Sequence, residues 1–404
     1  MADFTIAGGG IAGLVLARRL ALGGRSVTLH EASEQLGGTV GQHRVGDLDL
    51  DSGAESFAVY GGVVAALAAE LGLETEPPAT SGAWLLPPSG DARPLPATGV
   101  FGIPGRPLAA DVRAVLGLGG SLRAAVDGML PAKPLAMDVT IGALVRERMG
   151  QRALERLVAP VVHGVYSLDP NDLAVDTAVP ALRGALTREG SLAAAVRSLR
   201  AAAPAGSAVA GIRGGMHQLV LALTRELAHL GVDVRLGHAA DLTDTGLIVA
   251  APFAPGGRMV TLVTLVVDVP ELDSAPRGTG VLVASGAAGV RARALTHSTA
   301  KWGWLRELAA GRHVLRLSYD DGALPHVELP HAELREIARN DAQALLGAPI
   351  AAESVLDFDT VEWTRPRPTP APPGVTAVGE SVAGSGLARI IAHADRVAEV
   401  LLAD

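Results

Sequence analysis

The sequence predicts a mixed α/β fold, α+β overall, that begins with a nucleotide-binding sheet. Three features of the first forty residues predict it. An apolar run over 2–7 reads as a buried strand, Gly8, Gly10 and Gly13 follow it, and Glu31 stands eighteen positions after the last of these glycines. Glycines at such a turn let the backbone approach a pyrophosphate, which the N-terminus of the next helix then faces. The pattern indicates a Rossmann-like dinucleotide site.

Each element of this site follows from local sequence. The run 11–22 predicts a helix that opens with Ile11 and Ala12, and two glycines at 23 and 24 end it. A second strand over 26–30 leads to Glu31, whose carboxylate can accept hydrogen bonds from both ribose hydroxyls and would repel the 2′-phosphate of NADP. The alternative is a glycine-rich turn in an unrelated α/β protein.

Composition excludes several other classes of protein. The chain has no cysteine, which removes disulfides, thiolate metal sites, cysteine nucleophiles and a flavin linked through sulfur. Its eleven histidines are scattered, so we expect no metal site. A net charge of −8 argues against a nucleic-acid partner. We see no apolar run long enough to span a membrane and no signal peptide, and expect a cytoplasmic protein.

The predicted domains are interleaved along the chain. We assign residues 1–76, 204–257 and 371–404 to the nucleotide-binding domain, 77–105 and 258–370 to a second, mixed-sheet substrate domain, and 106–203 to a helical insertion. The insertion has apolar residues at three-and-four spacing, and the runs 260–269 and 280–284 read as strands.

A second glycine segment lies near the C-terminus. Gly379 and Glu380 end a short strand, and Gly386 and Leu387 begin a long helix that includes Ile390. Glycines at such a junction let backbone N–H groups approach the ribityl chain of a flavin. This segment favours a flavoprotein over a simple NAD dehydrogenase, although an ordinary glycine-capped turn is the alternative.

Further sequence blocks carry a family resemblance. They include Asp51-Ser52-Gly53-Ala54-Glu55-Ser56-Phe57, Ala159-Pro160-Val161-Val162-His163-Gly164-Val165-Tyr166, Gly214-Gly215-Met216, Ala294-Leu295-Thr296-His297-Ser298-Thr299-Ala300-Lys301-Trp302 and Arg316-Leu317-Ser318-Tyr319. With the two glycine segments, the chain resembles the oxygen-dependent FAD protoporphyrinogen/coproporphyrinogen III oxidases of the amine oxidase and phytoene desaturase superfamily. It is most similar to the soluble Gram-positive branch, whose substrate is coproporphyrinogen III.

The resemblance implies a reaction, a cofactor and partners. The reaction would be the six-electron oxidation of coproporphyrinogen III by O₂, giving H₂O₂, in heme biosynthesis, and it calls for no general base. The cofactor would be FAD, held without a covalent bond. The partners would be the tetrapyrrole, O₂ and, transiently, a ferrochelatase, with contact at a membrane surface.

The resemblance also implies site residues. FAD would be held by Gly8, Gly10, Ile11, Ala12, Gly13, Glu31, Ala32, Gly37, Gly38, Thr39, Gly53, Ala54, Glu55, Ser56, Trp363, Gly379, Glu380, Gly386, Leu387 and Ile390. One wall of the substrate site would be Thr279, Gly280 and Leu282, the opposite wall His163 and Gly164, with Lys301 and Tyr60 nearby.

Several of these roles have alternatives. Leu282 can be plain core packing, and His163 a core histidine bonded to backbone. Lys301 can pair with a substrate propionate or with a structural carboxylate. Because the chain is net acidic, local cations must attract the propionates, and the candidates are Lys301, a protonated His163 and, more weakly, Arg183.

Departures from the family pattern leave other functions open. Relatives commonly carry a basic residue where this chain has Gln35 and Tyr60, and some loops are shortened. The alternatives are a protoporphyrinogen IX oxidase, another FAD amine oxidase or desaturase, and a non-catalytic protein that binds flavin or porphyrin.

Overall fold

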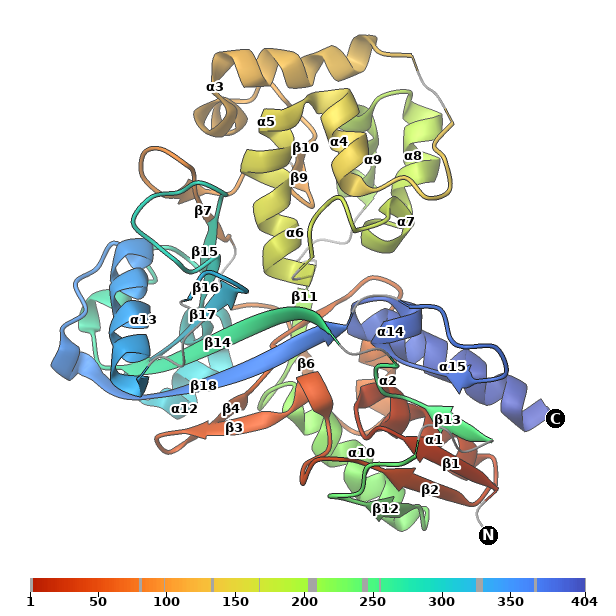
Figure 1. Ribbon diagram of the computed structural model, residues 1–404. Helices are drawn as coiled ribbons and strands as arrows, with labels where there is room; N and C mark the ends of the chain where they lie inside the picture. The colour runs from red at the N-terminus through yellow and green to blue at the C-terminus, as the bar shows by residue number, and fades with distance from the viewer. Residues whose placement is uncertain are drawn as a thin grey trace.

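A five-stranded parallel sheet organises the N-terminal part of the fold (Figure 1). The computed structural model describes residues 3–79, 82–97, 99–131, 134–166, 168–202, 209–241, 246–253, 256–324, 330–366 and 369–403. The sheet contains β1 (Phe4–Ala7), β2 (Val27–His30), β12 (Asp233–Arg235), β13 (Leu247–Val249) and β19 (Thr376–Ala377), in the order β12-β2-β1-β13-β19. In chain order this is 3-2-1-4-5, the Rossmann arrangement, in which ligands bind at the carboxyl ends of the strands where the order reverses. The predicted nucleotide fold is confirmed.

Three helices pack on one face of this sheet. They are α1 (Ile11–Leu22), with the bounds predicted from the sequence, α10 (His217–His229) and α15 (Leu387–Ala403). Smaller elements flank them: η1 (Gly38–Val40), the hairpin β3 (Gln42–Val45) and β4 (Leu48–Asp51), α2 (Val63–Glu70), α14 (Glu380–Ala383), and a small sheet of β5 (Phe57–Ala58), β11 (Val209–Ile212) and β6 (Thr75–Glu76). The strands of the five-stranded sheet therefore come from three separate stretches of the chain, as expected for a domain that is interleaved with the others.

A mixed seven-stranded sheet forms the second layer. Its order is β18-β14-β17-β16-β15-β7-β8. The strands are β7 (Trp84–Leu86), β8 (Arg93–Pro94), β14 (Gly257–Val267), β15 (Gly280–Val283), β16 (Ala294–His297), β17 (His313–Asp320) and β18 (Val355–Pro366). One face of the sheet packs on α13 (His331–Leu346), while α11 (Ser298–Lys301) and α12 (Gly303–Ala309) connect β16 to β17.

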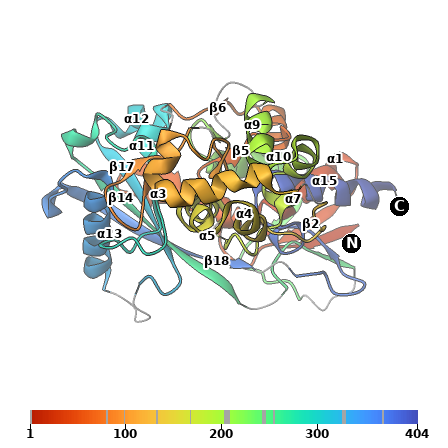
Figure 2. The same ribbon diagram turned by 90° about the horizontal axis from the view of Figure 1, so that it is seen from above.

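The predicted helical insertion is also present. It contains α3 (Ala110–Ala125), α4 (Ile141–Met149), α5 (Gln151–Ala153), a π-helical turn η3 (Leu154–Val158), α6 (Ala159–Tyr166), α7 (Val175–Ala178), α8 (Leu182–Glu189) and α9 (Leu192–Ala202). These helices share a separate apolar core and stand over the junction of the two sheets (Figure 2). The exact domain boundaries stay a prediction.

No helix in the described parts of the chain is long and apolar enough to cross a membrane.

Candidate active site

The first glycine turn leaves room for a ligand at the N-terminus of α1. Gly8 has a φ of +114°, and a Cβ on it would meet the Ala250 carbonyl oxygen at 2.7 Å. A Cβ on Gly13 would lie 1.9 Å from the carbonyl oxygen of Gly8, so these two glycines allow strand and helix to approach each other. A Cβ on Gly10, in contrast, would meet no atom within 4 Å. The free space at Gly10, beside the first N–H groups of α1, fits an anionic phosphate.

Glu31 is fixed beside this turn. Its Oε2 accepts a hydrogen bond from the Gly9 N–H at 2.7 Å, and its Oε1 accepts bonds from the N–H and hydroxyl of Ser33 at 2.9 and 2.8 Å. These bonds hold the carboxylate at the end of β2, where the ribose of a dinucleotide lies in this fold. The role predicted for Glu31 agrees with this position and stays a prediction.

The other predicted cofactor segments adjoin the same turn. The Gly37 N–H donates to the Gly9 carbonyl at 2.8 Å, and Gly37 adopts a φ of +113°. Next along the cradle, the Ala54 N–H donates to the Thr39 carbonyl at 2.8 Å. At the carboxyl end of β19, a Cβ on Gly379 would lie 3.3 Å from Cβ of Ala12. The structure thus brings the sequence-distant segments 8–13, 31–39, 53–56 and 379–390 around one cradle, which fits a flavin nucleotide.

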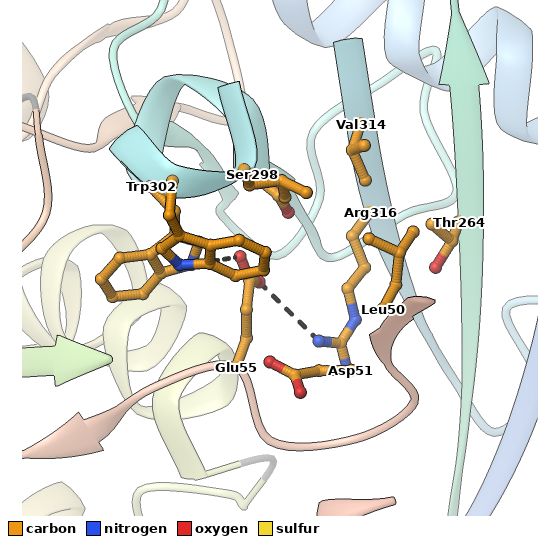
Figure 3. A pocket seen from close by; sticks show the side chains of 10 residues that line it. Leu50, Asp51, Glu55, Thr264, Ser298, Trp302, Val314 and Arg316 are labelled. Atoms are coloured by element: carbon orange, nitrogen blue, oxygen red, sulfur yellow. Dashed lines mark hydrogen bonds and ion pairs between the residues drawn. The ribbon is translucent and has the colours of Figure 1, made fainter. Parts of the chain in front are cut away.

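A buried charged group supports the segment 52–56. Trp363 on β18 donates from Nε1 to the Ser52 carbonyl at 2.7 Å, and Arg316 on β17 donates to the Gly53 carbonyl. Trp302 donates from Nε1 to Glu55 at 2.8 Å, and Arg316 lies 3.7 Å from the other Glu55 oxygen. Figure 3 shows Trp302 and Arg316 converging on Glu55.

Glu55 is ionised in this setting. Burial alone would raise the pKa of its carboxyl, but Lys301 and Arg316 hold that pKa below its ordinary value. Lys301 also donates to the Ser56 hydroxyl at 3.4 Å and lies 4.9 Å from the centre of the Trp302 ring. The charge of Lys301 thus acts on a structural carboxylate, and its pairing with a substrate propionate stays a prediction.

A pocket with about 310 Å³ of empty space, part of it open to solvent, lies beside Glu55 (Figure 3). It is lined by Leu50, Asp51, Glu55, Thr264, Ser298, Trp302, Trp304, Leu305, Val314 and Arg316.

Within the described residues there is no group of three or more His, Asp or Glu that could hold a metal ion.

The predicted substrate walls meet each other. Cδ2 of Leu282 on β15 lies 2.5 Å from where a Cβ on Gly164 of α6 would be, so the two walls are in contact at this point. Gly280 has a φ of +138°, and a Cβ on it would lie 2.1 Å from the Leu295 carbonyl oxygen. The close packing of β15 on β16 therefore requires glycine at 280, whether or not this residue also contacts a substrate. Thr279 lies beside it, and its N–H donates to the Gly82 carbonyl at 3.2 Å. Tyr60 is 62% exposed.

The surroundings of two of the predicted propionate-binding cations, His163 and Arg183, do not favour that role. Burial lowers the pKa of His163, and Arg258 lowers it further, which disfavours the protonated form that binding a propionate would need. Arg183 donates from Nη2 to Asp176 at 2.7 Å and from Nη1 to the Leu135 carbonyl at 2.6 Å, so its donors serve the helical insertion.

Sequence reasoning missed three arginines. The charges of Arg258 and Arg293 act on His163, and the charge of Arg365 acts on Arg293. Arg293 and Arg258 form ion pairs with Asp320 on β17. The alternation of Arg316, Ser318 and Asp320 with Leu315, Leu317 and Tyr319 along β17 could have revealed this polar face of the sheet.

Comparison with known proteins identifies the family. The model of the flavin-containing amine oxidoreductases matches residues 11–241, more than half of the chain. The chain belongs to this family. It is therefore a flavin oxidoreductase, and the expected superfamily is confirmed.

Individual relatives match along most of the chain. A coproporphyrinogen III oxidase of Mycobacterium leprae (strain TN) is 28% identical, over 100% of this chain and 98% of the relative. That of Mycobacterium tuberculosis (strain H37Rv) is 29% identical, over 95% and 90%. Among solved structures, a candidate protoporphyrinogen oxidase from Exiguobacterium sp. 255-15 shares the fold with a TM-score of 0.80, at 21% identity over 100% of this chain and 99% of that one.

Proposed function

We propose that this flavin oxidoreductase oxidises coproporphyrinogen III to coproporphyrin III, with O₂ as the final acceptor and H₂O₂ as the second product. The observation that carries the proposal is the similarity to the Mycobacterium leprae coproporphyrinogen III oxidase along the whole of both chains. The position of the cradle beside a polar sheet face agrees with a substrate that is both a large ring and a polycarboxylate.

The cofactor in this proposal is FAD, bound without a covalent link. FAD is favoured over FMN because Glu31 stands where the ribose of an adenylate would lie. The absence of cysteine removes a thioether link to the ring. When bound, the flavin supplies a two-electron acceptor that O₂ reoxidises.

The residues of the chain would then bind and orient the substrate. Trp363 and Arg316 fix the backbone at Ser52 and Gly53, which borders the cradle. Glu55 is held as a carboxylate by its cations, and we assign it a positioning role. Oxidation to an aromatic porphyrin is downhill, so orientation and exclusion of water can suffice without a dedicated base.

The test begins with the purified protein. Heat or acid should release a yellow chromophore that chromatography identifies as FAD, and the protein should then be assayed with coproporphyrinogen III and protoporphyrinogen IX by porphyrin fluorescence and H₂O₂ formation. A higher kcat/KM for coproporphyrinogen III supports the proposal. A higher kcat/KM for protoporphyrinogen IX would show that protoporphyrinogen IX is the preferred substrate instead. Bound flavin without turnover of either substrate contradicts both. The cytoplasmic location and the contact with a ferrochelatase stay predictions that belong to this proposal.

A further inference from the structure

The seven-stranded sheet has two chemically different faces. On β17, Leu315, Leu317 and Tyr319 are fully buried in the core that includes α13. Their neighbours Arg316 and Ser318 point to the opposite face, because side chains alternate along a strand. This polar face is turned toward the cradle, since Arg316 on it donates to the Gly53 carbonyl.

Three arginines gather at one end of this polar face. Arg258 on β14 and Arg365 on β18 occupy directly opposite positions of the antiparallel pair. Arg258 lies 2.5 Å from Asp320 Oδ2, and Arg293 lies 2.6 Å from Asp320 Oδ1. Arg365 donates from Nη2 and Nε to one oxygen of Glu380, at 2.6 and 3.0 Å. In the ion pairs among the described residues, three guanidinium groups thus meet two carboxylates.

This arrangement holds like charges close together, and an anion placed between them would be attracted. Like charges at directly opposite positions of a β pair destabilise it. The Arg293 side chain is only 9% exposed, and burial, with the charges of Arg258 and Arg365, lowers its pKa to about 10 although Asp320 opposes the shift. The carboxylate of Glu380 also accepts a hydrogen bond from Ser385 at 2.8 Å. Counted over the three arginines, Asp320 and Glu380, the cluster therefore carries more positive than negative charge in a partly desolvated place.

The cluster lies between the cradle and α6. Trp363, two residues before Arg365 and on the same face of β18, donates to the Ser52 carbonyl. Glu380 follows Gly379 of the cradle directly. On the other side, His163 of α6 is close enough for Arg258, Asp320 and Arg293 to influence its pKa.

We propose that Arg258 and Arg365, backed by Arg293, bind a carboxylate of the substrate, a propionate side chain of the tetrapyrrole. The guanidinium group suits this role because its fork of N–H donors matches a carboxylate in two parallel hydrogen bonds. Naming the ligand as a propionate rests on the proposed function. The arginine cluster itself rests only on the structure.

The first test measures binding without turnover. Coproporphyrin III, with four carboxylates, and its neutral tetramethyl ester are titrated into flavin-loaded protein at the same low detergent concentration, and flavin fluorescence reports binding. The acid should bind the wild type at least about tenfold more tightly than the ester, as expected for charge-assisted hydrogen bonds. Equal affinities, or no binding of the acid, would overturn the proposal.

Variants then locate the effect. Arg258→Met should weaken binding of the acid about tenfold and leave binding of the ester unchanged, and Arg258→Lys should recover part of the loss. Arg312→Met is the matched control, because Arg312 forms an ion pair with Asp47 at 2.5 Å just before β17 begins, at the opposite end from Asp320. Equal losses in Arg258→Met and Arg312→Met would contradict the assignment. If Arg258→Met does not fold, Arg258→Lys and the comparison of acid with ester decide.

Two further readings separate this proposal from others. FAD affinity of the apoprotein should be the same in wild type and Arg258→Met, since a parallel loss would assign the arginines to the cofactor phosphates and overturn the proposal. If the wild type turns over no porphyrinogen but binds coproporphyrin through Arg258, the proposed function fails and the carboxylate site stands. If turnover is normal and the KM of Arg258→Met is unchanged, the carboxylate site fails and the function stands.

Discussion

At the scale of single residues, the glycines of the first turn divide into two kinds. Gly13 allows the strand and helix to touch, whereas a side chain on Gly10 would project into free space from an ordinary φ of −71°. Gly10→Asp should therefore fold normally and lose stoichiometric flavin, because the carboxylate would fill the phosphate space with like charge. Flavin absorbance after gel filtration and the circular dichroism spectrum measure the two effects.

Gly13→Ala is the matched comparison for Gly10→Asp. Its Cβ would lie 1.9 Å from the Gly8 carbonyl oxygen, so it should lower the free energy of unfolding as well as flavin binding. Full flavin occupancy in Gly10→Asp would show that the phosphates lie elsewhere.

A buried histidine pair makes stability depend on pH. Burial, together with His313 and Arg306, lowers the pKa of His297 from 6.5 to about 3. Its Nε2 lies 3.1 Å from Nδ1 of His313, an arrangement that requires at least one neutral ring. Below pH 6.5 the unfolded chain binds a proton at His297 that the folded chain does not bind until about pH 3. Acid therefore favours unfolding across this window, by about 2 kcal/mol at pH 5.

Urea denaturation at pH 7 and pH 5 measures this contribution. In His297→Asn the difference between the two free energies of unfolding should be about 2 kcal/mol smaller than in the wild type. Histidines that do not contact His297, such as His43 and His393, are common to both proteins and cancel in the comparison. The same pH dependence in both proteins would show that His297 is not the group responsible.

At the scale of elements, short-range sequence patterns were enough to predict the nucleotide fold. They were not enough to predict the polar face of the seven-stranded sheet. The bounds of α1 followed from its apolar run and the glycines at either end, and the short strand predicted before Gly379 is β19. The opposition of Arg258 and Arg365 could not be predicted, because it depends on the register between strands about a hundred residues apart. The π-helical turn before α6 was missed as well. It ends two residues before Pro160, which cannot donate a helical hydrogen bond.

Strand β15 provides a prediction about sheet packing. Gly280 combines a φ of +138° with a Cβ position 2.1 Å from the Leu295 carbonyl oxygen, so Gly280→Ala should push β15 from β16 and lower the free energy of unfolding by about 2–4 kcal/mol. Gly286→Ala is the control, since Gly286 has a φ of +83° with no atom within 4 Å of its Cβ and should lose only about 1 kcal/mol. Chemical denaturation compares them, and equal losses would refute the close approach of the two strands.

At the scale of the whole molecule, overall charge and local charge oppose each other. The net charge of −8 repels a polycarboxylate, while the arginine cluster attracts it over a short distance. The sequence alone indicated that local cations were needed, but its candidates were Lys301, His163 and Arg183. In the structure the charge of Lys301 acts on Glu55, burial lowers the pKa of His163, and Arg183 donates to Asp176. The partner of each cation is set by the tertiary structure and could not be predicted from the composition.

The sign of the salt effect decides which field governs binding. If the arginine cluster dominates, raising the ionic strength should raise the KM for coproporphyrinogen III, with four propionates, more than the KM for protoporphyrinogen IX, with two, and narrow the gap between them. If the net charge dominates, salt should instead lower the KM for the four-propionate substrate. Steady-state porphyrin fluorescence at two ionic strengths distinguishes these outcomes. In Arg258→Met the rise should be smaller than in the wild type, because one of the attracting charges is gone, and an unchanged rise would place the attraction elsewhere on the molecule.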